Sequence, residues 1–305
     1  MTQTNDTKIG CLGEVMLELI PATGDAARLG IAGDTYNTAV YLARADIAVD
    51  YITVLGHDGF SDRIRRHMTS YHVGTGRLVT HQTRIPGLYA IDTDETGERS
   101  FTYWRGESAA RCLGAPDLPA IPELLRGLSH VFYSGISLAI LAQECRDRLF
   151  AALADFRAAG GIVAFDSNYR PRLWASPDEA RREMERAWRH CDIGLPSVDD
   201  EMALNGDADD AAVLARFADY GVTQGALKRG ADGPIGLDGT PFTGPAKDLH
   251  VVDSTAAGDS FNAAFLAALI GGKSTGDALL AGHTLAGQVI GQSGAIIFPP
   301  PGASA

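Results

Sequence analysis

Short apolar runs alternate with amphipathic stretches along most of this chain, and this alternation limits the possible folds more than any other feature of the sequence. Residues 144–159 have helical spacing and stop at Gly160 and Gly161, as a helix C-terminus does. A second helix is predicted to open at Ser176, with Pro177 in its first turn. Strand–helix alternation over about 250 residues predicts an α/β fold with a mostly parallel sheet flanked by helices. The predicted strands are 9–12, 48–55, 130–133, 162–165, 192–195 and 225–228.

One region of the chain breaks this alternation. Residues 85–93 and 99–105 have the pattern of two strands joined by a short turn. Period-two spacing places Phe101, Tyr103 and Arg105 on one face of the second strand. Such a hairpin is expected to form a lid over a site or a clasp between subunits, or else to extend the main sheet at its edge.

The sequence contains no internal repeat and no Ser- or Pro-rich linker. This predicts a single domain over residues 1–305. We assign residues 12–20 and 85–105 to a small β lid on that domain.

The charge balance excludes two classes of partner. The chain has 38 acidic and 26 basic residues and a formal net charge of −12, and neither nucleic acid nor an anionic membrane supplies the cations that such a protein attracts. A small anionic substrate held by a few arginines is compatible with the same composition. The four cysteines form no C-x-x-C pair, and the longest apolar run, 263–270, is too short to cross a membrane. We therefore expect a cytoplasmic protein.

Residues 253–261 are the most informative for chemistry. Small residues at 255–258 follow an apolar run and precede helical spacing, so they form a tight turn into a helix N-terminus. Main-chain N–H groups at such a terminus bind anionic oxygen, and Asp259 lies in the first helical turn. The helix dipole should keep Asp259 ionised at neutral pH, ready to accept a proton from an alcohol. This combination suits phosphoryl transfer, but the same residues also permit an ordinary turn in which Asp259 only caps the helix.

This segment resembles the C-terminal signature D-T-x-G-A-G-D-x-F of the ribokinase-like (pfkB) carbohydrate kinases. It departs from that signature at Ser254 and at Ala256, where the family has Thr and Gly. The resemblance implies a ribokinase-like three-layer sandwich and transfer of a phosphoryl group from ATP with Mg²⁺. It assigns the catalytic base to Asp259 and places the main chain of Ala256, Ala257 and Gly258 around the transferred group. The matching positions are Asp253, Thr255, Ala257, Gly258, Asp259 and Phe261.

A second segment, residues 32–39, resembles the family's N-terminal signature G-G-x-x-x-N-x-A. Gly33 permits a turn, Asp34 can cap a helix, and Asn37 lies one turn later on the same face. A helix cap alone would account for Asp34. The resemblance implies that Gly33, Asp34 and Asn37 hydrogen-bond sugar hydroxyls.

Two further segments bear on the substrate. Asn168 and Arg170 alternate with their neighbours after the strand at 162–165, at the carboxyl end where parallel sheets bind ligands. Arg105 offers a second guanidinium, and a guanidinium fork matches a planar carboxylate. A sugar acid is therefore favoured over a neutral sugar. The motifs G-L-Y at 87–89, Y-W-R at 103–105 and D-x-N-Y-R-P at 166–171 together resemble those of the family's 2-keto-3-deoxygluconate kinases. This resemblance implies contacts to the keto-acid from Tyr89, Tyr103, Arg105 and Arg170. The alternative is that both arginines are surface or ion-pair residues.

The nucleotide-binding residues are assigned mainly by resemblance. No P-loop or dinucleotide fingerprint is present. Residues 197–201 take the place of the family's N-x-x-E element, in which an acid orients Mg²⁺-bound water; either Asp200 or Glu201 is that acid, and we assign Glu201. A monovalent cation such as K⁺ near Asp253 is also implied. The other residues expected to bind ATP are Ser197, Lys228, Gly230, Gly233, Thr255, Ala257, Gly258 and His283.

These observations predict an enzyme that phosphorylates the C6 hydroxyl of 2-keto-3-deoxygluconate with ATP. The alternatives are a fructokinase-like kinase of a neutral sugar, or a non-catalytic sugar- or nucleotide-binding regulator with the same fold. A homo-oligomer, dimeric or higher, is expected because the lid hairpin can serve as a clasp between subunits.

Overall fold

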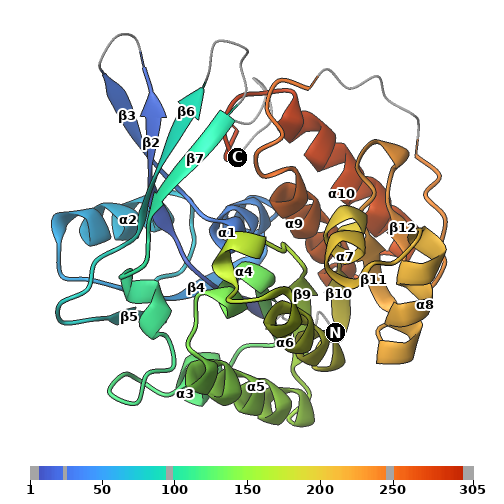
Figure 1. Cartoon of the computed structure of the whole chain (residues 1–305), viewed down its shortest axis with the longest axis horizontal. Helices are drawn as coiled ribbons and strands as arrows, with labels where there is room; N and C mark the ends of the chain where they lie inside the picture. The colour runs from blue at the N-terminus through green and yellow to red at the C-terminus, as the bar shows by residue number, and fades with distance from the viewer. Residues whose placement is uncertain (1–6, 23–25, 94–98, 245–250, 298–305) are drawn as a thin grey trace, which may run out of the picture.

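The computed structural model describes residues 7–22, 26–93, 99–244 and 251–297 (Figure 1). Within them the chain forms one sheet of eight strands and one of four. The larger sheet has the order β12-β11-β10-β9-β8-β1-β4-β5, and its neighbouring strands are parallel except for β11 and β12. Its strands are β1 (Lys8–Leu12), β4 (Ala48–Leu55), β5 (Leu78–Thr80), β8 (His130–Ser134), β9 (Ile162–Asp166), β10 (Ile193–Leu195), β11 (Gln224–Leu227) and β12 (Ile235–Gly236).

Every apolar run that was predicted to be a strand forms one, so the mostly parallel α/β fold is confirmed. The strands of the sheet centre are buried on both faces. On β8, Val131 and Tyr133 pack into the core on one side of the sheet, whereas Phe132 packs into the core on the other. A strand covered on both sides needs apolar residues at every position, which explains why these strands read as continuous apolar runs.

Helices cover both faces, which gives the predicted three-layer sandwich (Figure 1). None of the helices in the described part of the chain is long and apolar enough to span a membrane. The helices that pack on the face of Phe132 are α1 (Asp34–Arg44), α2 (Gly59–Ser70), α9 (Ala257–Ile270) and α10 (Thr275–Ile290). Those on the face of Tyr133 are α3 (Ile121–Leu125), α4 (Gly135–Ala139), α5 (Gln143–Ala158), α6 (Pro177–Arg189), α7 (Val198–Asn205) and α8 (Asp210–Tyr220).

The predicted helix ends agree with the structure. Helix α5 ends one residue before its C-cap Ala159, and Gly160 follows with a φ of 91°, a left-handed conformation that favours glycine. The hydroxyl of Ser176 caps α6 by accepting a hydrogen bond from the Glu179 N–H, and Pro177 is the first helical residue.

The smaller sheet has the order β3-β2-β6-β7 and stands out from the main body beside α1 and α2 (Figure 1). The predicted hairpin is present as antiparallel β6 and β7, but it belongs to this separate sheet. The alternative of a hairpin that extends the main sheet is therefore wrong. The turn of the hairpin lies outside the described residues, and β3 was not predicted. The strands are β2 (Met16–Pro21), β3 (Ala27–Ala32), β6 (Leu88–Thr93) and β7 (Arg99–Trp104).

One face of the small sheet is directed toward the start of α9. Met16, Tyr89 and Ile91 form a small apolar cluster with Ala295, and Ala256 packs against it. Because Ala256 immediately precedes α9, this contact places the small sheet beside the N-terminus of that helix. We call the four-stranded sheet the lid.

Candidate active site

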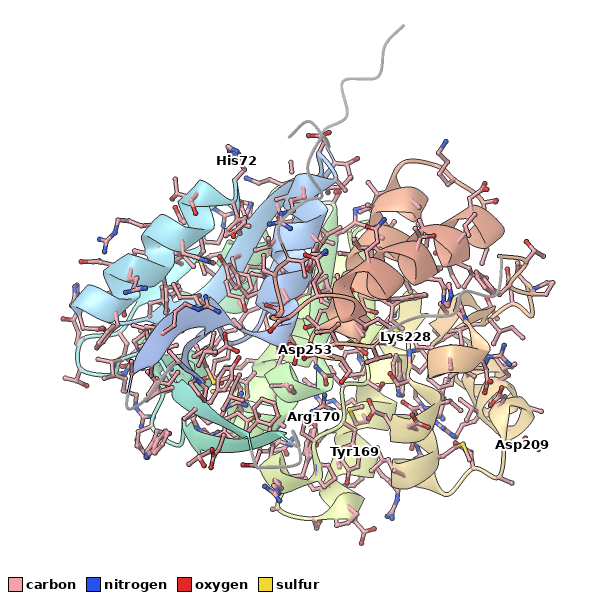
Figure 2. The ribbon with its side chains drawn as sticks, turned by 90° about the horizontal axis from the view of Figure 1, so that it is seen from above. His72, Tyr169, Arg170, Asp209, Lys228 and Asp253 are labelled. Carbon is pink, nitrogen blue, oxygen red and sulfur yellow. The ribbon has the colours of Figure 1, made fainter. Side chains whose placement is uncertain are left out.

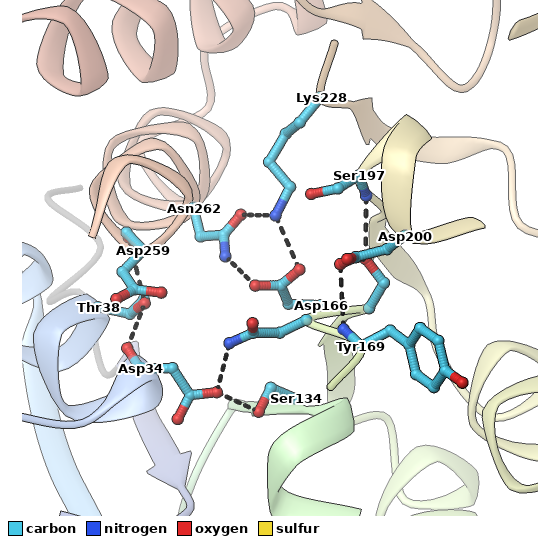
Figure 3. A network of polar contacts seen from close by, with 12 residues as sticks. Asp34, Thr38, Ser134, Asp166, Tyr169, Ser197, Asp200, Lys228, Asp259 and Asn262 are labelled. Carbon is cyan, nitrogen blue, oxygen red and sulfur yellow. Dashed lines mark hydrogen bonds and ion pairs between the residues drawn. The ribbon is translucent and has the colours of Figure 1, made fainter. Parts of the chain in front are cut away.

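Polar side chains from five separate elements converge at the carboxyl end of the main sheet (Figure 3). Ser134 ends β8 and Asp166 ends β9, while Lys228 follows the last residue of β11. Asp34 and Asp259 lie in the first turns of α1 and α9. Loops at this edge of a parallel sheet are where α/β proteins bind ligands, so these residues form the candidate active site.

Asp259 is held by α1. The Asn37 side-chain amide donates a hydrogen bond to Asp259 Oδ2 at 2.8 Å, and the Thr38 hydroxyl donates to the Asp259 main-chain oxygen at 3.2 Å. Desolvation, with the negative charge of Asp34 as the next cause, raises the pKa of Asp259 to about 8. The expectation that the helix dipole keeps Asp259 ionised at neutral pH is therefore wrong for the free protein, because desolvation and neighbouring acids outweigh the dipole.

Asp34 does not cap its helix, contrary to one sequence interpretation. Gly33 is the N-cap and Asp34 is the first residue of α1. Asp34 Oδ2 accepts hydrogen bonds from the Ser134 hydroxyl at 2.5 Å and from the Asn168 amide at 2.9 Å. Burial raises the pKa of Asp34. The other carboxylate oxygen, Oδ1, bonds to neither Ser134 nor Asn168, so it can accept a hydrogen bond from a ligand hydroxyl.

Gly33 is required by packing and not by a turn. Its φ of 174° is extended backbone that any residue adopts. A Cβ at this position would lie 2.2 Å from the main-chain oxygen of Glu14, far inside van der Waals contact. The expectation that Gly33 permits a turn is wrong: the glycine allows the segment before α1 to lie against the segment that enters the lid.

Lys228 is fixed by a closed triangle of polar contacts (Figure 3). Its ammonium group lies 2.7 Å from Asp166 Oδ1 and donates to Asn262 Oδ1 at 3.2 Å, and the Asn262 amide donates to Asp166 Oδ2 at 2.7 Å. Asn262 comes three residues after Asp259 on α9, so both side chains project from the same face of that helix. The triangle thereby connects β9, the end of β11 and α9.

The two acids left open by the sequence lie in different places. Asp200 Oδ2 accepts hydrogen bonds from the Tyr169 main-chain N–H at 3.0 Å and from the Ser167 hydroxyl at 3.1 Å, next to the triangle around Lys228. Glu201 turns away and pairs with Arg216 at 3.0 Å. Burial raises the pKa of Glu201 to about 7. Successive residues of a helix point about 100° apart, so only one of the two acids can face the site.

A cavity of about 620 Å³ adjoins this polar cluster on the side of α9 and α10. Apolar side chains such as Phe242 and Ile290 form much of its wall, and the ring of His283 packs 4.6 Å from that of Phe242. Thr255, which was expected to bind ATP, does not line the cavity. The expected residues that do line it are Ser197, Lys228, Gly230, Gly233, Ala257, Gly258 and His283.

The expected acid-binding residues lie on the lid side of the cluster. The Tyr89 hydroxyl donates to Glu18 Oε1 at 2.6 Å, and Tyr103 is half exposed. Arg105 is 8% exposed and forms an ion pair with Glu14. Arg105 is thus an ion-pair residue, as one alternative held, but it is not a surface residue.

Arg170 differs from Arg105 in its surroundings. Its side chain is 55% exposed and lies 3.9 Å from Asp200 Oδ1. Figure 2 shows Arg170 and Lys228 toward the middle of the molecule, whereas Asp209 lies at its outer edge. Arg170 is therefore exposed to solvent and lies next to the polar cluster through Asp200.

The sequence interpretation missed several residues of the cluster. Ser134 and Asn262 belong to no motif that was considered, and Ser167 was given no role in the segment after the strand at 162–165. Each of them contacts an aspartate of the cluster that lies more than 30 positions away along the chain. Within the described part of the chain, no group of three or more His, Cys, Asp or Glu side chains has the geometry to hold a metal ion by itself. A metal at this site would share its ligands with a bound substrate.

Comparison with known proteins agrees with this geometry. A family model described as "pfkB family carbohydrate kinase" matches residues 6–301. A 2-dehydro-3-deoxygluconokinase of Escherichia coli (strain K12) is 43% identical over 301 residues, which cover 95% of this chain and 97% of the relative. The chain is thus similar to that enzyme over nearly its full length.

Two solved structures are similar in fold. The 2-dehydro-3-deoxygluconokinase of Thermotoga maritima has a TM-score of 0.83 and 21% identity, with 95% of this chain and 96% of that chain covered. A candidate ribokinase II from E. coli, in complex with ATP and Mg²⁺, has a TM-score of 0.81 and 21% identity, with 95% and 94% covered. At this level of identity the likeness concerns the fold.

Proposed function

The chain belongs to the pfkB family of carbohydrate kinases, and from this premise we propose that it transfers the γ-phosphoryl group of ATP to the C6 hydroxyl of 2-keto-3-deoxygluconate. This compound is the 2-dehydro-3-deoxygluconate for which the similar E. coli enzyme is named. The observation that carries the proposal is the position of Asp259, which lies between a polar cluster suited to a sugar and a cavity large enough for a nucleotide.

Asp259 is the proposed catalytic base. Its carboxylate accepts the proton of the C6 hydroxyl while the hydroxyl oxygen bonds to the γ-phosphorus and the bond from that phosphorus to the bridging oxygen of ADP breaks. Asn37 donates to one carboxylate oxygen at 2.8 Å and so directs the other toward the substrate. The pKa of Asp259 in the free protein, about 8, already includes the lowering by the positive charge of Lys228, so at neutral pH only a minor part of the free enzyme carries the ionised base.

The start of α9 supplies the main-chain donors for the transferred group. Two amides there already have acceptors within the protein: the Thr255 N–H donates to Asp253 Oδ1, and the Ala257 N–H to the Ser254 oxygen. We therefore assign the amides of Ala256 and Gly258 to the phosphoryl oxygens. The positive end of the helix dipole strengthens this interaction.

The residues at the edge of the cavity fit Mg·ATP. Lys228 lines the cavity, and carboxylate oxygens of the kind that Mg²⁺ prefers lie beside it on Asp166 and Asp200. Mg²⁺ held there with ATP by Asp166 and Asp200 would neutralise the negative charge of the phosphates. We assign the water-orienting acid to Asp200 in place of Glu201, because Glu201 is paired with Arg216.

Substrate recognition is divided between two groups of residues. Gly33, Asp34 and Asn168 surround the position of the sugar hydroxyls, and Arg105 and Arg170 are proposed to bind the carboxylate with Tyr103 beside them. The guanidinium of Arg105 lies 5.7 Å from the centre of the Tyr103 ring, which holds the two side chains together on the lid. Tyr89 completes the lid side of the substrate site.

The test is ADP release with Mg·ATP, measured with 2-keto-3-deoxygluconate and with fructose in parallel. Wild-type protein, Asp259→Asn and Arg105→Ala are compared. We expect turnover of the keto-acid, loss of turnover in Asp259→Asn, and a raised KM in Arg105→Ala. Preferential turnover of fructose, at the same rate in the wild type and in Arg105→Ala, would indicate a fructokinase-like activity instead. Binding of ligands without turnover by the wild type would indicate a regulator.

We also propose a monovalent-cation site near Asp253. Asp253 accepts hydrogen bonds from the Thr255 N–H at 3.0 Å and from the Gly294 N–H at 2.8 Å, and so joins two segments next to the start of α9. A cation bound there would act on the orientation of the main-chain donors. We expect KCl to raise the turnover number above that in NaCl at equal ionic strength; equal rates would contradict the site.

A homo-oligomer formed through the lid is the remaining proposal. Trp104, at the end of β7, and Ile85, before β6, are 58% and 51% exposed. Large exposed apolar side chains are enriched where proteins associate. Light scattering of the wild type and of Trp104→Ser tests it. We expect a dimer or larger assembly that the substitution weakens, and a monomeric wild type would contradict it.

A further inference from the structure

The four connections between the lid and the main body meet at one buried ion pair. Glu14 precedes β2, Gly33 follows β3, Gly87 precedes β6, and Arg105 follows β7. A Cβ on Gly33 would lie 2.2 Å from the Glu14 main-chain oxygen, and a Cβ on Gly87 would lie 3.0 Å from Glu14 Oε1 and 3.1 Å from the Arg105 Cβ. The Glu14–Arg105 pair thus joins the segment that first enters the lid to the segment that finally leaves it.

The pair is deeply buried, and its hydrogen-bonding capacity is not used up. Glu14 is 1% exposed and Arg105 is 8% exposed. Apart from their ion-pair contact, neither Glu14 oxygen nor the Nε and Nη2 groups of Arg105 has a hydrogen-bond partner among the residues that the structure describes. A buried pair that served only to stabilise the fold is expected to have these groups satisfied, because unmade hydrogen bonds in the interior are costly.

We propose that Glu14 is a positioning residue that sets the preference of the site for an acid. Its carboxylate neutralises Arg105 in the empty site and fixes the guanidinium at the base of the lid, and the remaining N–H donors of Arg105 bind the carboxylate of the substrate. A guanidinium has five donors in a rigid plane, so one carboxylate can orient it while a second binds another edge. This inference rests on the proposed function, since it concerns how Arg105 binds the acid.

The position of the Glu14–Arg105 pair also couples substrate binding to the placement of the lid. Because Glu14 and Arg105 stand at the two outer connections of the lid, the acid end of the substrate meets the protein where the lid joins the main body. Correct orientation of Arg105 and correct placement of the lid therefore depend on the same contact. A neutral sugar, which has no carboxylate at this end, does not use it.

The experiment is a double-mutant cycle on Glu14→Gln and Arg105→Ala. Each variant is assayed with 2-keto-3-deoxygluconate and with 3-deoxyfructose, in which a hydroxymethyl group replaces the carboxylate. We expect Glu14→Gln to raise the KM for the acid about tenfold and to change kcat by less than about twofold. The KM or inhibition constant of 3-deoxyfructose should stay unchanged. In the Arg105→Ala background, Glu14→Gln should add no further effect on the acid.

Two controls separate positioning from a loss of folding. Asp50→Asn removes a buried acid that pairs with Arg77 and Lys8 near the N-terminal end of β4, away from the site, and should leave both KM values unchanged. Glu14→Met combined with Arg105→Met replaces the pair by apolar side chains of similar size, a change that buried ion pairs often tolerate. This double variant should fold, as measured by its melting temperature, and should no longer prefer the acid.

The outcomes distinguish the possible failures. An equal rise in KM from Glu14→Gln with and without Arg105, or equal effects on the acid and on 3-deoxyfructose, would overturn the positioning role. No effect of Arg105→Ala on the acid would remove Arg105 from the site and the inference with it. Absence of wild-type activity on the keto-acid would overturn the proposed function itself.

Discussion

The two halves of the site are built differently. On the sugar side, side chains bind one another: Lys228, Asp166 and Asn262 form a closed triangle with contacts of 2.7 to 3.2 Å. On the nucleotide side, a cavity of about 620 Å³ is lined by glycines and apolar side chains such as Phe242. The first half is cross-linked by polar contacts and rich in acids, and the second is a cavity with few such contacts.

The contrast follows from what each half must do. Proton removal and in-line transfer need reacting groups placed to within a fraction of an ångström, and cross-linked side chains provide that placement. A nucleotide base is held by shape and by main-chain contacts, which individual side chains influence less. Lys228 and its partner Asp166 connect the two halves: Lys228 lines the cavity and closes the triangle, and Asp166 is proposed to face Mg·ATP. Substitutions on the sugar side should therefore cost much more than those on the nucleotide side.

The largest effect is expected for Asp259→Asn. The amide cannot accept the proton of the C6 hydroxyl, so kcat should fall about a thousandfold while the KM for each substrate changes little. Steady-state ADP release measures both constants. Asp277→Asn is the matched control, since Asp277 also lies in the first turn of a helix but is exposed. A fall of less than about tenfold would remove Asp259 from the catalytic step.

Lys228→Met should have the next largest effect. It removes the charge that faces the phosphates and leaves the carboxylate of Asp166 buried without its ammonium partner. We expect kcat to fall about a hundredfold and the KM for ATP to rise, a combination not expected of a residue in one half alone. Lys273→Met, at an exposed lysine, is the control. A change in the KM for ATP without loss of kcat would place Lys228 in the nucleotide half only.

The same contrast explains what the sequence could predict. Asp259 and Lys228 lie in short local motifs, so the sequence predicted them as site residues. The strands of the main sheet are continuous apolar runs, so the sequence predicted them as well. Ser134 and Asn262 act through partners about a hundred residues away, and a single sequence carries no record of such contacts. The assembled sheet decides which side chains meet.

Neighbouring positions were also difficult to separate by sequence. Asp200 and Glu201 are both acids in the first turn of α7, and only the packing of α7 against Arg216 decides which one faces the site. The charge state of Asp259 was misjudged for a related reason. The helix dipole is a local property, whereas desolvation and the charge of Asp34 come from the folded chain.

The crowding of acids on the sugar side predicts a pH dependence. With the pKa of Asp259 at about 8, kcat/KM for the free enzyme should fall about tenfold between pH 8.5 and pH 7, because the base must be ionised. A rate profile at constant ionic strength measures this. A flat profile over that range would contradict the raised pKa.

Stability should vary with pH in the opposite direction. A carboxyl whose pKa is higher in the folded than in the unfolded protein favours folding most when it is protonated, so the free energy of unfolding should fall as pH rises from about 4 to about 8. Asp259→Asn abolishes this ionisation, and its melting temperature should exceed that of the wild type more at pH 8 than at pH 5. Equal differences at the two pH values would count against Asp259 as the titrating group.

On the nucleotide side, His283→Ala should have a modest effect. Its ring packs against Phe242 in the cavity wall, so truncation removes part of one apolar surface and leaves the main-chain contacts. We expect the KM for ATP to rise about threefold with kcat unchanged. His190→Ala, at the end of α6, is the control. A loss of more than about thirtyfold would show that this half also depends on single side chains and would break the comparison.

The smallest effect is expected for Ala256→Gly, at the boundary between the two halves. Ala256 is the N-cap of α9 and has a φ of 61°, a left-handed conformation that is unfavourable for alanine. The family signature has glycine at this position. Relief of this strain, of about 1 kcal/mol, is partly offset by the greater freedom of glycine in the unfolded chain. We expect the melting temperature to rise by about 1–3 °C with kcat unchanged. Ala257→Gly, one residue later in ordinary helical conformation, should lower it instead. If both substitutions lower the melting temperature equally, the left-handed conformation of Ala256 does not destabilise the protein. Alanine then presents the amides at the start of α9 to the phosphoryl group as well as the family's glycine does.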